Sequence, residues 1–209
     1  MSFLIKNYIL HPNHHGNRVD HSTTTALVKI YSTIYLNHDS NYNSVLFANN
    51  LSTAFDTIYH LILLAKLEHY SIRGKTLELF KSFLENRFSY VHLETFNSNK
   101  LILGQYGCVQ GSKISGLLYI LYTNEIPLIV NIIKQPDILI YITGQNPPNF
   151  TNITHKTINY VDNSAHIISF TNTNELKTYL ENFYTLIYYI YISNKLKINS
   201  DKTKIIFSH

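Results

Sequence analysis

The stretch from Asn159 to Ala165 constrains the fold of this chain most, because it joins two β-prone runs through a short polar turn. Thr157 and Ile158 lead into it, and His166–Phe170 leads out of it. Two such runs around a tight turn predict a β-hairpin with Asp162-Asn163 at its tip. A hairpin tip can hold a carboxylate in a cleft, where it can bind a cation. Asp and Asn are also the commonest turn formers, so the tip alone equally fits a plain turn.

The rest of the pattern predicts an α+β fold, because strands and helices alternate irregularly. Apolar residues at helical spacing predict helices at Thr24–Leu36, His60–Tyr70, Thr76–Phe88, Leu117–Tyr122 and Asn174–Tyr191. The predicted antiparallel sheet holds Ser44–Ala48, Thr157–Tyr160 and Ala165–Phe170. We expect helices on one face of this sheet, drawn from His60–Arg87 and Ser112–Thr123.

Three segments give a weaker pattern. Tyr90–Glu94 alternates like a strand, and Leu101–Leu103 is its expected partner. Asn131–Thr157 contains three prolines and little periodicity, which predicts an irregular loop or insertion. The C-terminal segment from Asn194 to Phe207 predicts two short strands.

Composition excludes some classes of protein. The chain has 209 residues, enough for one domain or two small ones, and a formal net charge of +4 that suits a polyanionic partner. Its single cysteine, Cys108, excludes an internal disulfide framework and a multi-cysteine zinc site. No signal peptide is evident, and the most apolar region, Gly116–Ile142, is interrupted by charged and amide residues. We therefore expect an intracellular protein of the cytoplasm or nucleus, neither secreted nor bound to a membrane.

Six motifs, in order along the chain, resemble those of one family. The segments and the family patterns they resemble are His15–Thr23 (G-F-R-x-x-H-S-T), Asn50–His60 (D-L-S-K-A-F-D-x-V-x-H), Leu63–Arg87 (L-L-x-K-L-x-x-x-G-I-x-G with F-x-S-Y-L-x-x-R), Gly107–Leu118 (G-V-P-Q-G-S-x-L-G-P-L-L), Tyr160–Asn163 (Y-A-D-D) and Leu196–Phe207 (L-x-L-N-x-x-K-T-x-x-x-F). The chain thus resembles the reverse transcriptase domain of non-LTR (LINE-type) retrotransposons. One motif could arise by chance, but six in the same order make chance a poor explanation.

The resemblance implies a fold, partners and a cofactor. The expected fold is a polymerase-type palm with partial helical fingers: residues 1–43 as partial fingers, and residues 44–209 as the palm-like core with the insertion at 131–157. A thumb and an endonuclease domain are expected to be absent. The implied partners are an RNA template, a DNA primer and deoxynucleotides, and oligomeric state stays open. The implied cofactor is Mg²⁺ or Mn²⁺, as a pair of ions that activate the primer hydroxyl and stabilise the leaving group.

The carboxylates that hold these ions in the family fall at Asn50, Asp162 and Asn163, so two of the three are replaced by amides. Asp162 is the one metal ligand retained, and removal of two negative charges weakens the attraction for the metal by several kcal/mol at intermediate dielectric. Asp56 lies beyond the strand end and is not expected to substitute. The resemblance therefore predicts a catalytically impaired or inactive copy. A weakly active polymerase and a non-catalytic nucleic-acid-binding module remain as alternatives.

The resemblance also assigns roles around this centre. Phe55 matches the aromatic residue under the incoming sugar, and a core phenylalanine is a compatible reading. Gln110, Gly111 and Ser112 match the loop near template and nucleotide, where glycine lets backbone approach a ligand. Lys202 matches a lysine near the leaving phosphates, and Arg18 matches a fingers arginine that meets phosphate. A solvated strand-end lysine is the simpler alternative for Lys202.

Overall fold

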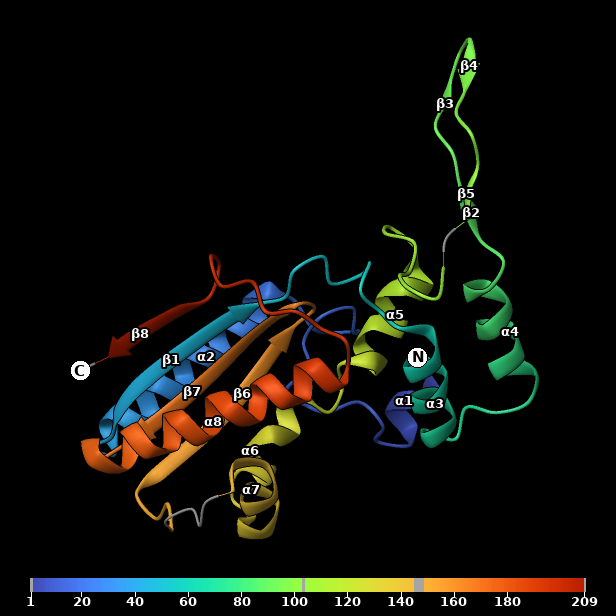
Figure 1. Ribbon diagram of the computed structural model, residues 1–209. Coiled ribbons are helices and arrows are strands. Elements are labelled where there is room, and N and C mark those ends of the chain that lie inside the picture. The colour runs from blue at the N-terminus through green and yellow to red at the C-terminus, as the bar shows by residue number, and fades with distance from the viewer. Residues whose placement is uncertain (1, 103, 145–148, 209) are drawn as a thin grey trace.

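The centre of the molecule is a four-stranded antiparallel sheet in the order β6-β7-β1-β8 (Figure 1). The computed structural model describes residues 2–102, 104–144 and 149–208. The strands are β1 (Asn43–Asn50), β6 (Ile153–Tyr160), β7 (Asn163–Phe170) and β8 (Lys204–Ser208). Strands β6 and β7 form the predicted hairpin, and β7 pairs along its whole length with β1. The predicted α+β class with an antiparallel sheet is confirmed.

Helices cover both faces of this sheet, although the sequence pattern predicted one face. Helix α2 (Thr23–Asp39) packs on one side and α8 (Thr173–Ser193) on the other (Figure 1). Phe47 contacts Phe183 of α8 with ring centroids 5.5 Å apart, whereas Leu46 packs with Ala26 of α2. Consecutive apolar residues in β1 bury both faces of the strand, and that requires a helix on each side.

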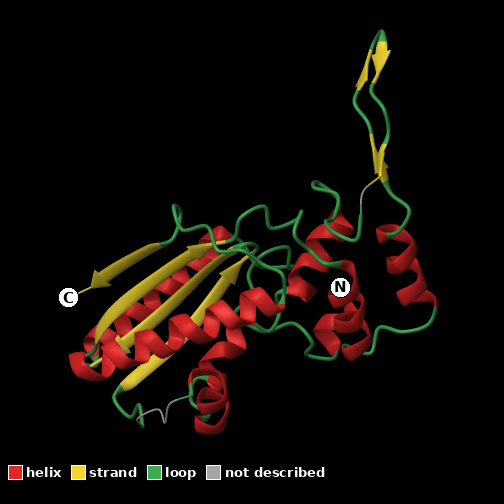
Figure 2. Ribbon diagram, viewed as in Figure 1, coloured by secondary structure: helices red, strands yellow, loops and turns green. Residues whose placement is uncertain are grey.

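Helices α3 (His60–His69), α4 (Lys75–Leu84) and α5 (Lys113–Tyr122) form a second group beyond the end of the sheet, not on its face (Figure 2). The C-terminal half of α5 is buried, and its fully buried run Leu118–Tyr122 packs in the core beside α3. Ser112 caps α5 by accepting a hydrogen bond from the Ile114 backbone N–H at 3.3 Å. The short helix α1 (Ser2–Lys6) lies beside this group.

A long, narrow hairpin projects from the helical group into solvent (Figure 1). β2 (Phe88–Ser89) pairs with β5 (Leu101–Ile102), and β3 (His92–Leu93) pairs with β4 (Phe96–Asn97). The predicted pairing of Tyr90–Glu94 with Leu101–Leu103 is therefore wrong in register, because β3 turns back on β4. Leu103 lies outside the described residues.

The irregular loop predicted over Asn131–Thr157 is partly regular. A 3₁₀ turn η1 (Ile126–Leu128) leads to α6 (Ile129–Ile132) and α7 (Pro136–Thr143), and β6 begins at Ile153. Pro136 starts α7 rather than breaking it, because the first turn of a helix needs no amide hydrogen there. Leu139 of α7 is fully buried, and α7 packs against α8. Pro147 and Pro148 lie outside the described residues.

The C-terminal segment forms one strand, β8, and not two. The segment before it contributes only an isolated bridge between Ile198 and Leu51. Within the described residues, no single helix is long and apolar enough to cross a membrane, although Lys113–Ile132 and Pro136–Thr143, bent by 105°, reach the required length and composition as a pair.

Candidate functional site

Three polar side chains meet where β1 ends beside the β6–β7 turn. Asn50 is the last residue of β1 and is paired with Asn163, the first residue of β7. Asp162 lies in the turn between β6 and β7. The Asn50 side-chain amide donates to Asp162 Oδ2 at 3.3 Å and to Asn163 Oδ1 at 2.8 Å. The Asn163 amide donates to the other Asp162 oxygen at 3.3 Å. The segments are 112 residues apart in sequence, and the sheet register brings them together.

Within this cluster, Asn50–Asp162–Asn163, the Asp162 carboxylate is hydrogen-bonded by the two neighbouring amides. Both carboxylate oxygens of Asp162 accept an amide N–H, so the anion is satisfied by neutral donors. A pair of divalent ions needs several anionic oxygens facing a common point, and this cluster offers one carboxylate. Within the described residues no three His, Cys, Asp or Glu side chains gather to hold a metal ion. The donor set does not fit a two-metal site.

Asp56 is the acidic residue that follows β1 in sequence. It is exposed in the turn that follows β1, where its backbone N–H donates to Thr53 at 2.8 Å. Among the described residues no hydrogen bond joins it to Asp162. That Asp56 does not substitute for the lost carboxylates stays a prediction.

The turn that carries Asp162 is one residue earlier than predicted. The two-residue loop is Val161-Asp162, and Asn163 already belongs to β7. Val161 has a φ of +55°, a conformation that is strained for a β-branched residue. Gly16 packs directly against it: a Cβ at position 16 would lie 2.6 Å from both the Val161 backbone nitrogen and its Cγ2. The glycine is therefore required by this close approach.

The N-terminal segment holds the hairpin from its open edge. His14 forms a parallel bridge with Asn159, and the His15 backbone N–H donates to the Asn159 carbonyl at 2.7 Å. Arg18 Nη1 donates to the carbonyls of His11 and His14, at 2.8 and 3.0 Å. The arginine predicted to meet phosphate therefore holds its own segment in place through that nitrogen.

A buried polar layer lies directly behind the cluster, and the sequence pattern did not identify it. Asn49, Ser164 and Asn159 are opposite one another on β1, β7 and β6, and all three are buried. The Asn49 amide donates to the Tyr191 hydroxyl at 2.7 Å. Burial raises the pKa of Tyr191 to about 12, although its hydrogen bonds with Ser164 and Asn49 act in the opposite direction. The only sequence signal was a second asparagine beside Asn50, since the partner on α8 is 142 residues away.

The predicted nucleotide and template residues fall at different distances from the cluster. Phe55 is half-buried and packs on Tyr119, with ring centroids 4.9 Å apart. Burial, with the Asp162 charge as a further cause, raises the pKa of Tyr119 well above its ordinary value. Gln110 and Gly111 are exposed in the loop before α5, where Gly111 has a φ of +84°.

Lys202 faces a pocket of about 260 Å³ between the first turns of α2 and the sheet. Tyr160 and Asn163, which flank the β6–β7 turn, line the same pocket, so Lys202 lies near the end of the sheet that carries this turn. The other lining residues come from α2, β1, β6 and β7: Thr23, Ala26, Leu27, Ile30, Ala48, Asn49, Ile158, Ser164 and Ala165. The pocket thus combines the Lys202 ammonium group, polar side chains near the cluster and apolar side chains of α2.

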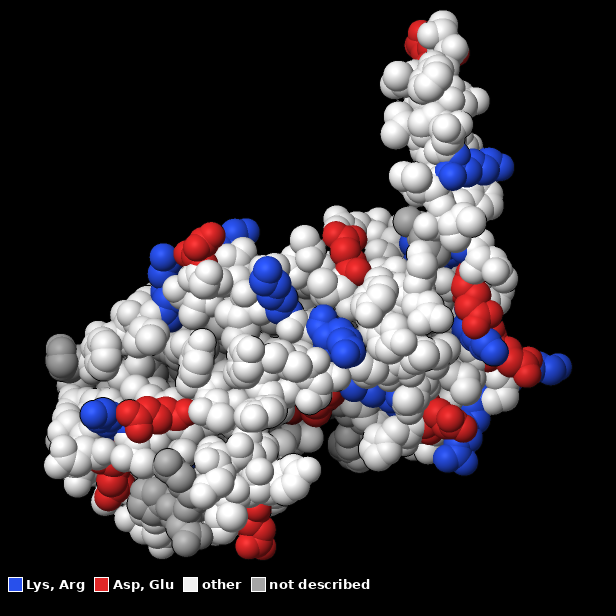
Figure 3. Space-filling model, in the orientation of Figure 1, with Lys and Arg blue, Asp and Glu red and all other residues white. Residues whose placement is uncertain are grey.

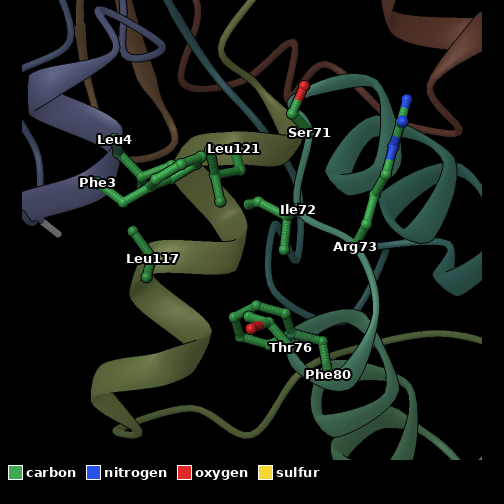
Figure 4. Close-up of a pocket in the computed structure, with 9 residues that line it drawn as sticks. All are labelled: Phe3, Leu4, Ser71, Ile72, Arg73, Thr76, Phe80, Leu117 and Leu121. Atoms are coloured by element: carbon green, nitrogen blue, oxygen red, sulfur yellow. The ribbon is translucent and has the colours of Figure 1, made fainter.

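A second pocket, of about 370 Å³, is apolar and separate from the cluster (Figure 4). It lies between α1, the turn after α3, α4 and α5, and its lining is Phe3, Leu4, Ser71, Ile72, Arg73, Thr76, Phe80, Leu117 and Leu121. The Arg73 side chain points away from Leu117 in Figure 4. No carboxylate lines this pocket, so it adds no metal ligand.

Comparison with known proteins agrees with this architecture. The family described as reverse transcriptase (RNA-dependent DNA polymerase) matches residues 3–208. A probable RNA-directed DNA polymerase from transposon X-element of Drosophila melanogaster is 31% identical over 132 residues, which is 62% of this chain and 13% of that protein.

Two solved structures share the fold. Apo telomerase from Candida tropicalis, truncated from its C-terminal domain, has a TM-score of 0.61 at 15% identity, over 100% of this chain and 38% of that one. Telomerase from the same yeast in complex with a fragment of telomeric RNA has a TM-score of 0.63 at 12% identity, over 100% of this chain and 33% of that one. The chain therefore spans a small part of each relative. By its sequence match from residue 3 to residue 208, this chain belongs to the reverse transcriptase family.

Proposed function

We propose that this chain is the reverse transcriptase domain of a non-LTR retrotransposon that has kept the palm framework and lost metal-dependent DNA synthesis. The observation that supports the loss is the Asn50–Asp162–Asn163 cluster, where two amides donate to one carboxylate. The corresponding active centre would copy an RNA template from a DNA primer with deoxynucleotides, in the cytoplasm or nucleus. On this proposal residues 1–43 are the remnant of the fingers and residues 44–209 the palm.

The chemistry explains why the substitution is decisive. A polymerase of this family uses divalent ions, and the ions need anionic oxygens to hold them beside the primer hydroxyl. An amide oxygen is neutral and its N–H₂ group donates hydrogen bonds. Here those N–H groups occupy the Asp162 oxygens that would face a cation. On this proposal the substitution removes two anionic ligands, and the amides compete with a cation for the carboxylate that remains.

Primer extension tests this proposal. The unmodified chain should give no product on an RNA template with a DNA primer, deoxynucleotides and either Mg²⁺ or Mn²⁺. The informative comparison is the double variant Asn50→Asp/Asn163→Asp, with Asp162→Asn added to it as the matched control. Extension by the double variant and none by the control would assign the metals to this cluster. Robust extension by the unmodified chain would overturn the proposal, and Asp56→Asn would then be the first variant to test.

The second candidate function is nucleic-acid binding without catalysis, and the positive net charge with exposed lysines supports it. The chain carries a net charge of +4, and Lys113 and Lys202 are exposed. Lysines that neutralise phosphates release counterions, so affinity for a primer–template duplex should fall steeply as salt rises. A mobility-shift titration at increasing salt measures this. Absence of binding at low salt, or binding insensitive to salt, would contradict this function.

A further inference from the structure

A groove on the α8 side of the molecule combines exposed tyrosines with lysines. It has a volume of about 670 Å³ and shares no lining residue with the pocket at Lys202. Its lining consists of Tyr106, Tyr184, Tyr188, Tyr191, Ile192, Lys195, Leu196, Lys197, Ile198 and Ser200. Two lysines and no carboxylate appear in that set. Figure 3 shows Lys and Arg side chains in the middle of this face, where the chain leaves α8 in Figure 1.

Three of the tyrosine rings in this groove are about half exposed to solvent. Tyr184 and Tyr188 are 58% and 50% exposed and lie one helical turn apart on α8, so their rings occupy the same face of that helix. Tyr106 comes from the loop before α5, is 51% exposed, and packs on Tyr59 with ring centroids 4.9 Å apart and planes at 33°. A tyrosine has few side-chain torsions to fix, so stacking on such a ring costs little conformational entropy.

The lysines are placed by backbone contacts to the end of β1. The Lys197 carbonyl accepts from the Ser52 backbone N–H at 2.8 Å, and the Asn199 N–H donates to the Asn50 carbonyl at 2.8 Å. Lys195 has a φ of +55°, and its N–H donates to the Ile192 carbonyl at 2.8 Å. Both lysine side chains are exposed. The loop backbone is therefore fixed, and within the part of the chain that the structure describes no hydrogen bond or ion pair engages the two ammonium groups.

We propose that this groove binds single-stranded nucleic acid, with bases stacked on Tyr106, Tyr184 and Tyr188 and phosphates contacted by Lys195 and Lys197. Open aromatic rings beside lysines in one groove are the features that bind single strands without sequence preference. An uncharged protein partner would leave the lysines unmatched, and a base-paired duplex would not expose its base faces to the rings. The inference does not depend on the catalytic state of the Asn50–Asp162–Asn163 cluster.

Fluorescence anisotropy with labelled oligo(dT) tests the groove on the full chain. Tyr184→Ala/Tyr188→Ala should weaken binding by about tenfold or more, because each stacked base is worth at least several-fold. Tyr184→Phe/Tyr188→Phe keeps the rings and should retain affinity. The matched control is Tyr31→Ala/Tyr35→Ala on α2, a pair with the same spacing and exposures of 70% and 68%. Unchanged oligo(dT) affinity in the α8 alanine variant, with unfolding temperatures preserved, would overturn the inference.

The salt dependence tests the lysines separately. Lys195→Gln/Lys197→Gln should lower the magnitude of the slope of log affinity against log salt by about 1.4, since each single-strand phosphate contact contributes about 0.7. Lys75→Gln/Lys177→Gln removes the same charge elsewhere on exposed positions and should leave the slope unchanged. An equal slope change in both pairs would mean that overall charge alone drives binding, which contradicts a defined groove.

Crosslinking locates the strand directly. Oligonucleotides carrying 4-thiouracil, irradiated with the full chain, should crosslink to peptides that contain Tyr106 or the segment 184–197. Crosslinks confined to other parts of the chain would overturn the inference. Stronger competition by polyglutamate than by an oligonucleotide of equal charge would instead indicate an acidic protein as the partner of this groove and would also overturn it.

Discussion

Buried histidines should make this domain unfold in mild acid. His166 and His14 are fully buried, and His155 is 8% exposed. His155 and His166 lie under α8 with ring centroids 5.5 Å apart. Burial lowers the pKa of His166 to about 3, and burial together with the Arg18 charge lowers the pKa of His14 to about 3. Burial and the neighbouring His166 also lower the pKa of His155 well below its ordinary value.

The size of the effect follows from proton linkage. The unfolded chain binds a proton on each histidine below the ordinary pKa of 6.5, whereas the folded state excludes it until the pH approaches 3. The free energy of unfolding is therefore highest above pH 6.5 and falls as the pH decreases toward 3. At about pH 4.5 each such histidine lowers the free energy of unfolding by about 2.5 kcal/mol, so His14 and His166 together lower it by about 5 kcal/mol. The whole free energy of unfolding of a native domain is about 5–15 kcal/mol.

Urea unfolding followed by circular dichroism, at neutral pH and at about pH 4.5, measures this loss. His166→Gln should reduce the decrease in the free energy of unfolding on acidification by about 2.5 kcal/mol, because glutamine has no group that takes up a proton on unfolding. The same substitution at His38, which is exposed at the end of α2, should leave the loss unchanged. A domain equally stable at both pH values would refute the reasoning, because it would require these histidines to be protonated or exposed in the folded state.

Two further substitutions test the framework of the site. Gly16→Ala should lower the unfolding temperature measured by calorimetry, because the new Cβ would lie 2.6 Å from Val161. Gly104→Ala is the control, since a Cβ there meets nothing within 4 Å and should change the unfolding temperature little. Equal effects of the two substitutions would contradict the close packing of Gly16. Tyr191→Phe should lower the free energy of unfolding in urea by about 1–3 kcal/mol, because Asn49 loses its hydroxyl partner, and Tyr189→Phe at a half-exposed position is the control. A Tyr191→Phe variant as stable as the unmodified chain would show that the buried layer does not need that bond.

The hairpin and its partner strand could be predicted because their signals are local. The predicted runs Ser44–Ala48, Thr157–Tyr160 and Ala165–Phe170 fall within β1, β6 and β7, although the first half of β6 was assigned to the predicted loop, and the motif order places Asn50 beside the turn. Periodicity alone could not assign the faces of the sheet. Val45, Leu46 and Phe47 are apolar in sequence, and only the structure shows that Leu46 meets α2 while Phe47 meets α8. The exact turn also escaped prediction, because a valine in the left-handed region is an improbable choice on local grounds.

The surroundings of the cluster depend on contacts that are distant in sequence. Gly16 appeared as one residue of a fingers motif, and its packing against Val161 joins positions 145 residues apart. α7 was missed because its proline was interpreted as a break, although the helix is stabilised by packing of Leu139 beside α8. The groove between Tyr106 and Lys197 is assembled from three segments, and although the last of them begins the Leu196–Phe207 motif, that motif alone does not indicate a groove with Tyr106 and α8.

The most direct test of the central claim is calorimetric titration of the chain with Mg²⁺ and Mn²⁺, compared with Asn50→Asp/Asn163→Asp. If the amides have disabled the site, the unmodified chain should show no saturable binding, and the double variant should bind saturably, at least about tenfold more tightly than the weakest affinity that the titration can detect, because two negative charges return to the cluster. Asp162→Asn added to the double variant should remove most of that gain. Saturable binding by the unmodified chain, or no gain in the double variant, would contradict the account and would place the metal site elsewhere.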